Sequence, residues 1–341
     1  AEVERLAELW LDRGADGFRL DAARYLIETG AGRGQADTAE THAFWREFST
    51  FVRHRVPTAV LVGENWAEAA TIATYFGSTD SVRAGDELPL NFNFPLADAV
   101  LDAARNGSAG PILDALEAVA RLYPAGVRDT PFLTNHDHVR VATQLANDSG
   151  RLRAAAAVLL TLPGVPFVYY GEEVGLRNGT ASGDEAKRTP MPWADVPGGG
   201  FTTGSPWYSF APGRDVANVA DQLDDSGSLL SHYRSLIQTR EASPALGAGE
   251  VRLPNHPNGA VLVLERTHAD ESVVVAVNLS GGFHSVTGIQ VDAWPDEELY
   301  ADGSAGDLTG SPGNLSIVLP PHATAVWRVD PVPTKRAWSA R

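Results

Sequence analysis

Strand-like apolar runs alternate with helical segments along the first two-thirds of the chain. The run 58–63 (TAVLVG) is continuously apolar, which is typical of a strand covered on both faces. A stretch with helical spacing, 41–56, precedes it and ends at Pro57. This alternation, repeated along the chain, indicates a parallel β/α architecture. The predicted strands are 17–20, 58–63, 88–94, 130–134 and 165–170, and the predicted helices are 2–13, 41–56, 67–76, 97–104, 111–123, 151–162 and 228–239.

The pattern changes after residue 246 to short β-rich runs. The runs 260–265 (AVLVLE) and 272–278 (SVVVAVN) are two of them, and turn signals such as Asn258-Gly259 separate the runs. We therefore predict a small antiparallel domain, a sandwich or a barrel, over 247–330, followed by a tail at 331–341. The β/α part would then occupy 1–246.

Charge and composition exclude several classes of partner. The formal net charge is −16 at pH 7, which argues against nucleic acid or an anionic membrane as a partner. No apolar run reaches membrane-spanning length, the longest being 154–160. The chain has no cysteine, so disulfides, thiolate nucleophiles and cysteine metal sites are excluded.

Three of the apolar runs end in a carboxylate. Asp21 follows GFRL, Glu64 follows LVG, and Asp137 closes FLTNHD. In barrels built from parallel β/α units, the C-terminal ends of the strands form the active site. We therefore expect these three acids to share one pocket. Three acids beside Arg19 and His136 are what the cleavage of a glycosidic bond requires.

The neighbours of the first two acids favour different roles. Arg19 and Asp21 are two residues apart on a strand, so Arg19 can hold Asp21 ionised, as a nucleophile requires. Glu64, buried beside other carboxylates, is expected to keep its proton and is a candidate general acid. The alternatives are an interior ion pair for Asp21 and a helix N-terminal acid for Glu64.

The pair His136-Asp137 suits hydrogen bonds to sugar hydroxyls. A metal site is the alternative, but adjacent residues of an extended chain point in opposite directions, which disfavours it. We predict no metal ligands and no certain cofactor. The isolated histidines form no pattern, and surface placement is the default for them: His42, His54, His232 and His256.

These motifs together resemble the α-amylase family of glycoside hydrolases, glycoside hydrolase family 13. GFRLDAAR, GENW and FLTNHD resemble three of its four signature regions, and GVPFVYYGEEVG resembles its eighth strand. The resemblance implies that Asp21 is the nucleophile, Glu64 the acid and then the base, and Asp137 the stabiliser of the transition state. It further implies that Arg19 holds the nucleophile and that Arg19 and His136 both belong to the substrate-binding residues.

The resemblance also assigns substrate-binding residues. Many starch-degrading members have Lys-His where this chain has Arg24 and Tyr25, and Arg24 can still contact a leaving-group sugar. Trp66 is the best candidate for a wall of the pocket, because aromatic rings stack on the apolar faces of sugars. The missing histidine weakens the case for Ca²⁺ at this point, and Ca²⁺ stays open for a full-length parent.

The resemblance covers the chain from its first helix onward. It implies a partial (β/α)8 TIM barrel, strands four to eight, followed by an antiparallel all-β sandwich domain. The first three strands and the first signature region are not in the sequence. We therefore expect a truncated chain that is poorly soluble or inactive alone, with a complementary N-terminal half as its partner.

The function implied is a retaining α-glycoside hydrolase that acts on α-glucans or α-gluco-oligosaccharides through a covalent glycosyl-enzyme intermediate. One alternative is a transglycosylase of the same family, a glucan- or sucrose-type glucosyltransferase. A second alternative is a non-enzymatic sugar-binding or scaffold relative, but such relatives typically lose the carboxylates that this chain retains.

Overall fold

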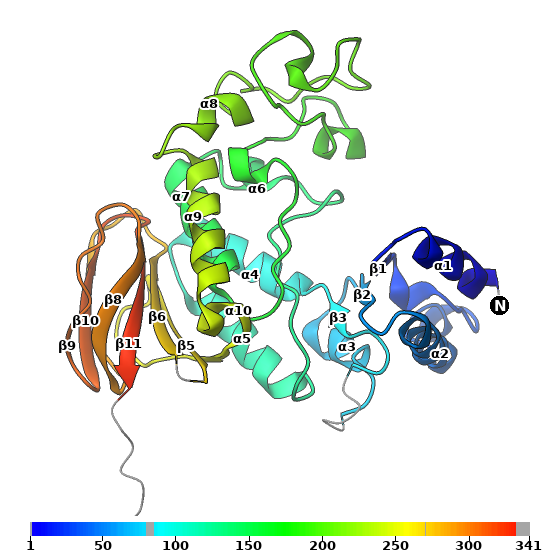
Figure 1. Cartoon of the computed structure of the whole chain (residues 1–341), viewed down its shortest axis with the longest axis horizontal. Coiled ribbons are helices and arrows are strands. Elements are labelled where there is room, and N and C mark those ends of the chain that lie inside the picture. Colours follow the sequence, from blue (N-terminus) through cyan, green and yellow to red (C-terminus); the bar gives the residue numbers. More distant parts are fainter. Residues whose placement is uncertain (1, 80–84, 270, 332–341) are drawn as a thin grey trace, which may run out of the picture. The chain divides into compact units, whose positions relative to one another are not determined.

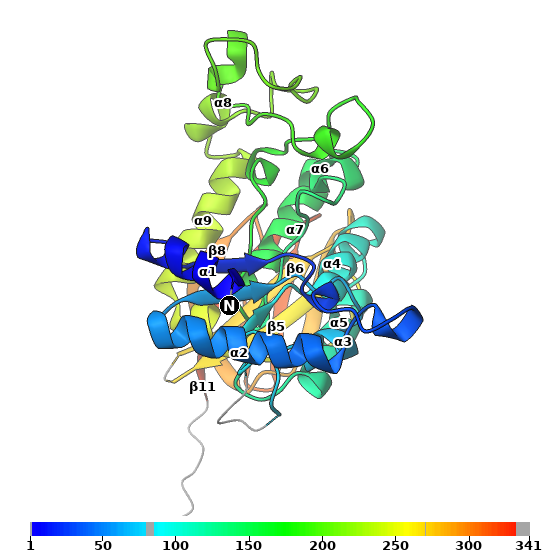
Figure 2. The ribbon, with the colours of Figure 1, turned by 90° about the vertical axis from the view of Figure 1, so that its right-hand side faces the viewer.

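The structure, a computed structural model, describes residues 2–79, 85–269 and 271–331. The chain forms two compact units (Figures 1 and 2). The first unit contains the residues up to 98 together with 114–132 and 164–167, and the second contains 99–113, 133–163 and the residues from 168 onward. None of the described helices is long and apolar enough to cross a membrane.

The secondary structure follows the predicted change from alternating elements to a β-rich end. The helices are α1 (Glu2–Asp12), α2 (Ala39–Arg55), α3 (Ala69–Thr74), α4 (Phe94–Asn106), α5 (Gly110–Leu122), α6 (Val141–Gln144), α7 (Ser149–Thr161), α8 (Val219–Leu223), α9 (Leu229–Ala242) and α10 (Pro244–Ala248). The strands are β1 (Gly17–Leu20), β2 (Val60–Gly63), β3 (Leu90–Asn91), β4 (Glu250–Arg252), β5 (Val261–His268), β6 (Glu271–Asn278), β7 (His284–Ile289), β8 (Ala293–Ala301), β9 (Thr309–Ser311), β10 (Asn314–Leu319) and β11 (Thr324–Pro331).

A parallel sheet forms the centre of the first unit. Its strands pair in the order β1-β2-β3, and single parallel bridges extend the row from Phe92 to Thr130 and from Phe132 to Phe167. Helices α1 and α2 pack on this sheet through a common buried cluster, to which Leu11 of α1 contributes. Figure 2 shows α2 running along one side of the strands.

Four of the five predicted strands are shorter in the structure than we expected, the strand at 58–63 by two residues. The strand expected at 88–94 reduces to β3, because Phe94 already begins α4 and the Asn93 side chain accepts a hydrogen bond from the backbone N–H of Leu96. The strands expected at 130–134 and 165–170 reduce to single bridges. Pro131 and Pro166 lie inside these segments, and proline has no N–H to donate to a ladder.

The second unit combines helices with the β-rich end of the chain. Helices α7 and α9 lie side by side (Figure 1). Two antiparallel sheets, β4-β5-β6-β11-β8 and β7-β10-β9, share one buried apolar cluster, which is the arrangement of a sandwich. The predicted domain limits at 246 and 330 stay predictions. Of the predicted tail, Pro331 ends β11 and 332–341 lie outside the described residues.

Candidate active site

The parallel register of β1 and β2 places two of the predicted acids next to each other. Leu20 pairs with Gly63, so Asp21 and Glu64 follow directly at the same end of the two strands. The Glu64 backbone N–H donates to the Leu20 carbonyl at 2.9 Å, and the Ala23 N–H donates to the Glu64 carbonyl at 3.0 Å. Backbone pairing alone therefore places Asp21 and Glu64 next to each other.

Arg19 connects the two carboxylates. Its Nη1 donates a short hydrogen bond to Asp21 Oδ1, and its Nη2 lies 2.7 Å from Glu64 Oε1. The other oxygen of Glu64, Oε2, accepts a hydrogen bond from the Ala22 backbone N–H at 2.8 Å. Ala22 has φ 44° and ψ 44°, a left-handed conformation that is uncommon outside glycine. This turn orients the Ala22 N–H toward Glu64.

The two acids differ strongly in exposure. The Asp21 side chain is 76% exposed, whereas that of Glu64 is 10% exposed. An exposed carboxylate beside a cation can approach and attack a substrate carbon. A buried carboxyl at the same strand ends can exchange a proton with a group held beside it. The pair thus has the asymmetry that acid and nucleophile roles require.

Arg24, which was predicted to contact the substrate, forms hydrogen bonds to other residues of the protein. The Arg24 guanidinium binds both oxygens of Asp37, and its Nη1 donates to the Trp66 carbonyl at 2.9 Å. The hydrogen bonds to Asp37 raise the pKa of Arg24. Tyr75 donates from its hydroxyl to Asp37 at 2.8 Å, so Asp37 is also held. Arg24 consequently ties the loop after β1 to the loop after β2.

The two predicted aromatic contacts remain accessible. Tyr25 is 50% exposed, and the Arg24 guanidinium lies over its ring. Trp66 is 51% exposed and stacks on Phe94, with ring centroids 5.0 Å apart and an interplanar angle of 14°. Stacking on the first residue of α4 fixes the plane of the indole. An indole held in this way can present a flat apolar surface to a sugar.

His136 and Asp137 belong to the second unit and interact with each other. His136 Nε2 lies 3.2 Å from Asp137 Oδ2. Arg188 Nη2 donates to Asp137 Oδ1 at 2.7 Å, and Arg188 Nε donates to the His136 carbonyl at 3.1 Å. Lys187 Nζ donates to the Asp137 carbonyl at 2.9 Å. Convergence of Asp137 on one pocket with Asp21 and Glu64 stays a prediction.

Sequence reasoning missed the residues that form hydrogen bonds to the predicted site residues. Lys187 and Arg188 lie about fifty positions after Asp137 in a long loop, and Asp37 lies in the polar loop after β1. No sequence signal links these cations to Asp137: Arg188 binds the Asp137 carboxylate, whereas Lys187 binds its backbone carbonyl. Within the described residues, no group of three or more His, Cys, Asp or Glu side chains is arranged to hold a metal ion.

Comparison with known proteins gives the family. Residues 1–249 match the family model described as alpha amylase, catalytic domain. The chain belongs to the α-amylase family. Its motifs at Asp21, Glu64 and Asp137 all fall within the matched residues, as the resemblance implied.

Similar proteins are longer than this chain. Alpha-amylase 3 of Dictyoglomus thermophilum is 32% identical over 284 residues, which cover 82% of this chain and 53% of that protein. The trehalose synthase/amylase TreS of Mycolicibacterium smegmatis is 32% identical over 296 residues, covering 75% of this chain and 49% of that protein. The crystal structure of an alpha-amylase from H. orenii aligns with a TM-score of 0.80 at 28% identity, covering 96% of this chain and 64% of that one. The chain therefore spans about half the length of these two relatives.

Proposed function

We propose that this chain supplies the catalytic acids of a retaining α-glycoside hydrolase for α-glucans or α-gluco-oligosaccharides. The observation that supports this best is Arg19, which contacts the carboxylates of both Asp21 and Glu64 at neighbouring strand ends. Membership of the α-amylase family and the amylase among its relatives support the substrate class.

The proposed reaction takes two steps. Asp21 attacks the anomeric carbon while Glu64 protonates the leaving-group oxygen, which gives a covalent β-glycosyl intermediate. Glu64 then takes a proton from water, whose oxygen bonds to the same carbon as the bond from that carbon to Asp21 breaks. This step frees the Asp21 carboxylate and releases the product with its α-configuration retained. This mechanism requires the two carboxyl groups to lie roughly 5–5.5 Å apart. Arg19, which donates to Asp21, would orient this carboxylate for the attack.

The remaining predicted residues would bind and stabilise the sugar. Asp137, held by Arg188, would face the positive charge that develops in the transition state, and His136 would bind a hydroxyl. Trp66 would form a wall of the pocket. We further propose that the parallel row from β1 to Phe167 forms strands four to eight of a (β/α)8 barrel.

Transglycosylation is the second candidate. One relative is named both a trehalose synthase and an amylase, which supports considering sugar transfer beside hydrolysis for this chain. The two activities differ only in whether water or a sugar hydroxyl attacks the intermediate. Measuring the products with and without a sugar acceptor separates them, and dominant transfer products would favour the transferase.

The test of the hydrolase uses Glu64→Gln in the complete gene product. We expect hydrolysis of maltooligosaccharides to fall by roughly 10²–10⁴-fold, because the leaving sugar needs a proton. For a substrate whose leaving group needs no proton, the rate of the first step should fall far less. Equal losses for both substrates would remove the acid role from Glu64, and unchanged activity would favour a non-catalytic role.

A further inference from the structure

A buried arginine of the second unit has no part in the proposed mechanism. Arg140 lies three residues after Asp137 and is 1% exposed. Its Nη1 donates to the Tyr170 carbonyl at 2.7 Å, whereas its Nε and Nη2 have no hydrogen-bond partner among the described residues. Burial lowers the pKa of the Arg140 guanidinium. Burying a cation with so few hydrogen bonds costs stability, so the groups that it contacts are informative.

Arg140 orients two adjacent tyrosines. Its guanidinium lies over the rings of Tyr169 and Tyr170, 4.5 Å and 4.6 Å from their centroids. The centroids of the two rings are 4.8 Å apart, with an interplanar angle of 69°. One planar cation can attract both rings, because each ring has a negative face. Arg140 therefore holds the two rings in a fixed relation to each other.

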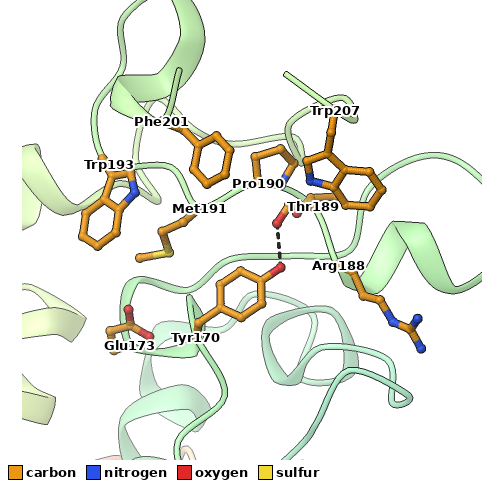
Figure 3. A pocket seen from close by; sticks show the side chains of 9 residues that line it. All are labelled: Tyr170, Glu173, Arg188, Thr189, Pro190, Met191, Trp193, Phe201 and Trp207. Carbon is orange, nitrogen blue, oxygen red and sulfur yellow. Dashed lines mark hydrogen bonds between the residues drawn. The ribbon is translucent and has the colours of Figure 1, made fainter. Parts of the chain in front are cut away.

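The hydroxyls of these tyrosines hold the backbone on both sides of Arg188. Tyr169 donates from its hydroxyl to the Lys187 carbonyl at 3.0 Å. Tyr170 donates to the Thr189 carbonyl at 2.7 Å, and Figure 3 shows this bond with Arg188 next to Thr189. Burial raises the pKa of Tyr169, so its hydroxyl keeps the proton that it donates. The two residues that flank Arg188 in the chain are thus both fixed.

Arg188 in turn contacts one of the proposed catalytic acids. Its Nη2 donates to Asp137 Oδ1 at 2.7 Å. Asp184 also lies 3.4 Å from this nitrogen, but the Asp184 side chain is 57% exposed. The Arg188 side chain is itself 38% exposed, and a long side chain with that exposure keeps several rotamers. Fixing the backbone on both sides limits where its guanidinium can reach.

We propose that the two tyrosines, oriented by Arg140, are positioning residues that place Arg188 on Asp137. We call Arg140, Tyr169 and Tyr170 the brace. Its contacts form a closed circuit, because they begin three residues after Asp137 and return to the Asp137 carboxylate through Arg188. The catalytic role of Asp137 rests on the proposed function, whereas the contacts of the brace do not.

The kinetic test is a double-mutant cycle in the complete gene product. Tyr169→Phe combined with Tyr170→Phe removes both hydroxyls and keeps both rings beside Arg140. We expect this pair to lower kcat for maltooligosaccharides about tenfold and to change KM less than about twofold, because Asp137 is proposed to act in the transition state. In an Arg188→Met background the same pair should lower kcat less than about twofold, since the side chain that the tyrosines position is already absent.

The matched control is Tyr300→Phe. Tyr300 donates from its hydroxyl to His232 at 2.6 Å in the same unit, so this variant also loses a hydroxyl contact. It should leave kcat unchanged with and without Arg188. Urea unfolding shows that each variant is folded before its kinetics are compared. Equal losses of kcat from the tyrosine pair in the two backgrounds would overturn the brace.

Crystal structures of the complete gene product separate the brace from the proposed function. The parent should show the Arg188–Asp137 contact, and the variant with both phenylalanines should lack it. A parent without this contact, or a variant that keeps it, would overturn the brace. Loss of the contact with an unchanged kcat would remove the positioning role. A parent that hydrolyses no maltooligosaccharide would remove the proposed function, and the structures alone would then decide the brace.

Discussion

A single arginine organises the acids at the ends of β1 and β2. Arg19 is one-third exposed and contacts both Asp21 and Glu64. Because it donates to both carboxyl groups at once, it can fix their relative orientation. Lysine carries the same charge but presents one compact ammonium, so it cannot reproduce both contacts. The planar guanidinium is therefore the feature to test.

Arg19→Lys should lower kcat/KM for maltooligosaccharides by about 10²-fold, because small displacements of catalytic groups reduce rates by that factor. The loss should appear mainly in kcat, because Arg19 contacts the two carboxylates that are proposed to react. The control is Arg121→Lys on the exposed surface of α5, which should leave the kinetics unchanged. A twofold or smaller change for Arg19→Lys would contradict the role given to it.

Residue types and order predicted part of this arrangement. Acids placed after consecutive apolar strands indicated that Asp21 and Glu64 would be neighbours, and the parallel pairing confirms it. The hydrogen bonds between residues far apart in the sequence could not be predicted. Arg188 reaches Asp137 across about fifty residues, and no periodicity links those positions. Arg24 was predicted as a sugar contact, but its guanidinium is engaged by Asp37, a residue without a motif.

At the scale of elements, close packing at the end of β2 positions Glu64. A Cβ at Gly63 would lie 2.6 Å from both Asn91 Oδ1 and Leu88 Cδ1, so these two buried side chains fill the space beside Gly63 and leave no room for a methyl group. Apolar runs were enough to predict the strands β1 and β2. They were not enough at Pro131 and Pro166, where the missing N–H groups leave only single bridges.

Gly63→Ala should therefore destabilise the fold by about 1–3 kcal/mol, the usual range for overpacking. It should also reduce activity, because Glu64 is the next residue. Gly110→Ala is the matched control: Gly110 begins α5, and an added Cβ there meets only Ser108 Oγ at 3.6 Å. Urea unfolding of both variants measures the effect. Equal midpoints would contradict the packing argument.

Helix α9 is attached through a buried histidine that was expected at the surface. That expectation was wrong, because His232 is 2% exposed. Its Nε2 lies 2.9 Å from the Arg153 carbonyl of α7 and acts as the donor there, while its Nδ1 accepts from the Tyr300 hydroxyl of β8 at 2.6 Å. Asp302, bound to Arg153, lies 3.4 Å from the same Nδ1. Spacing in the sequence could not show this, since the partners come from distant elements.

The pKa of His232 is lowered to about 4 by burial first and by the Arg153 charge second. The unfolded chain therefore binds this proton more readily between pH 6.5 and 4, and the free energy of unfolding falls as the pH is lowered through that window. The contribution is on the order of 3 kcal/mol. Urea titrations at pH 7 and 4.5 should show a smaller pH difference for His232→Gln than for the parent. An identical pH difference for the parent and the His232→Gln variant would contradict this contribution of His232.

At the scale of the whole molecule, the proposed acids are divided between the two units. The first unit provides Asp21 and Glu64, and the second provides Asp137. Among the described residues, β1 has β2 on one side and no strand on the other. The fold of the chain resembles about two-thirds of a solved alpha-amylase. Motifs predicted this family from the sequence, and the family comparison confirms it.

The open edge of β1 gives a prediction for the 341-residue chain expressed by itself. An unpaired strand edge promotes association with other chains. Exposed apolar residues on α1, among them Leu6 and Trp10, add to this tendency. Light scattering should show self-association, and maltooligosaccharide hydrolysis should be absent or weak. A soluble, fully active monomer would contradict the prediction.

The most direct test of the central claim is to trap the glycosyl intermediate. The complete gene product carrying Glu64→Gln is incubated with an α-glucosyl substrate that has a good leaving group, digested, and analysed by mass spectrometry. Without the base, the intermediate should accumulate. We predict a glucosyl adduct on the peptide that contains Asp21, and none after Asp21→Asn. An adduct on another residue, or turnover of the substrate by the Asp21→Asn protein, would contradict the account.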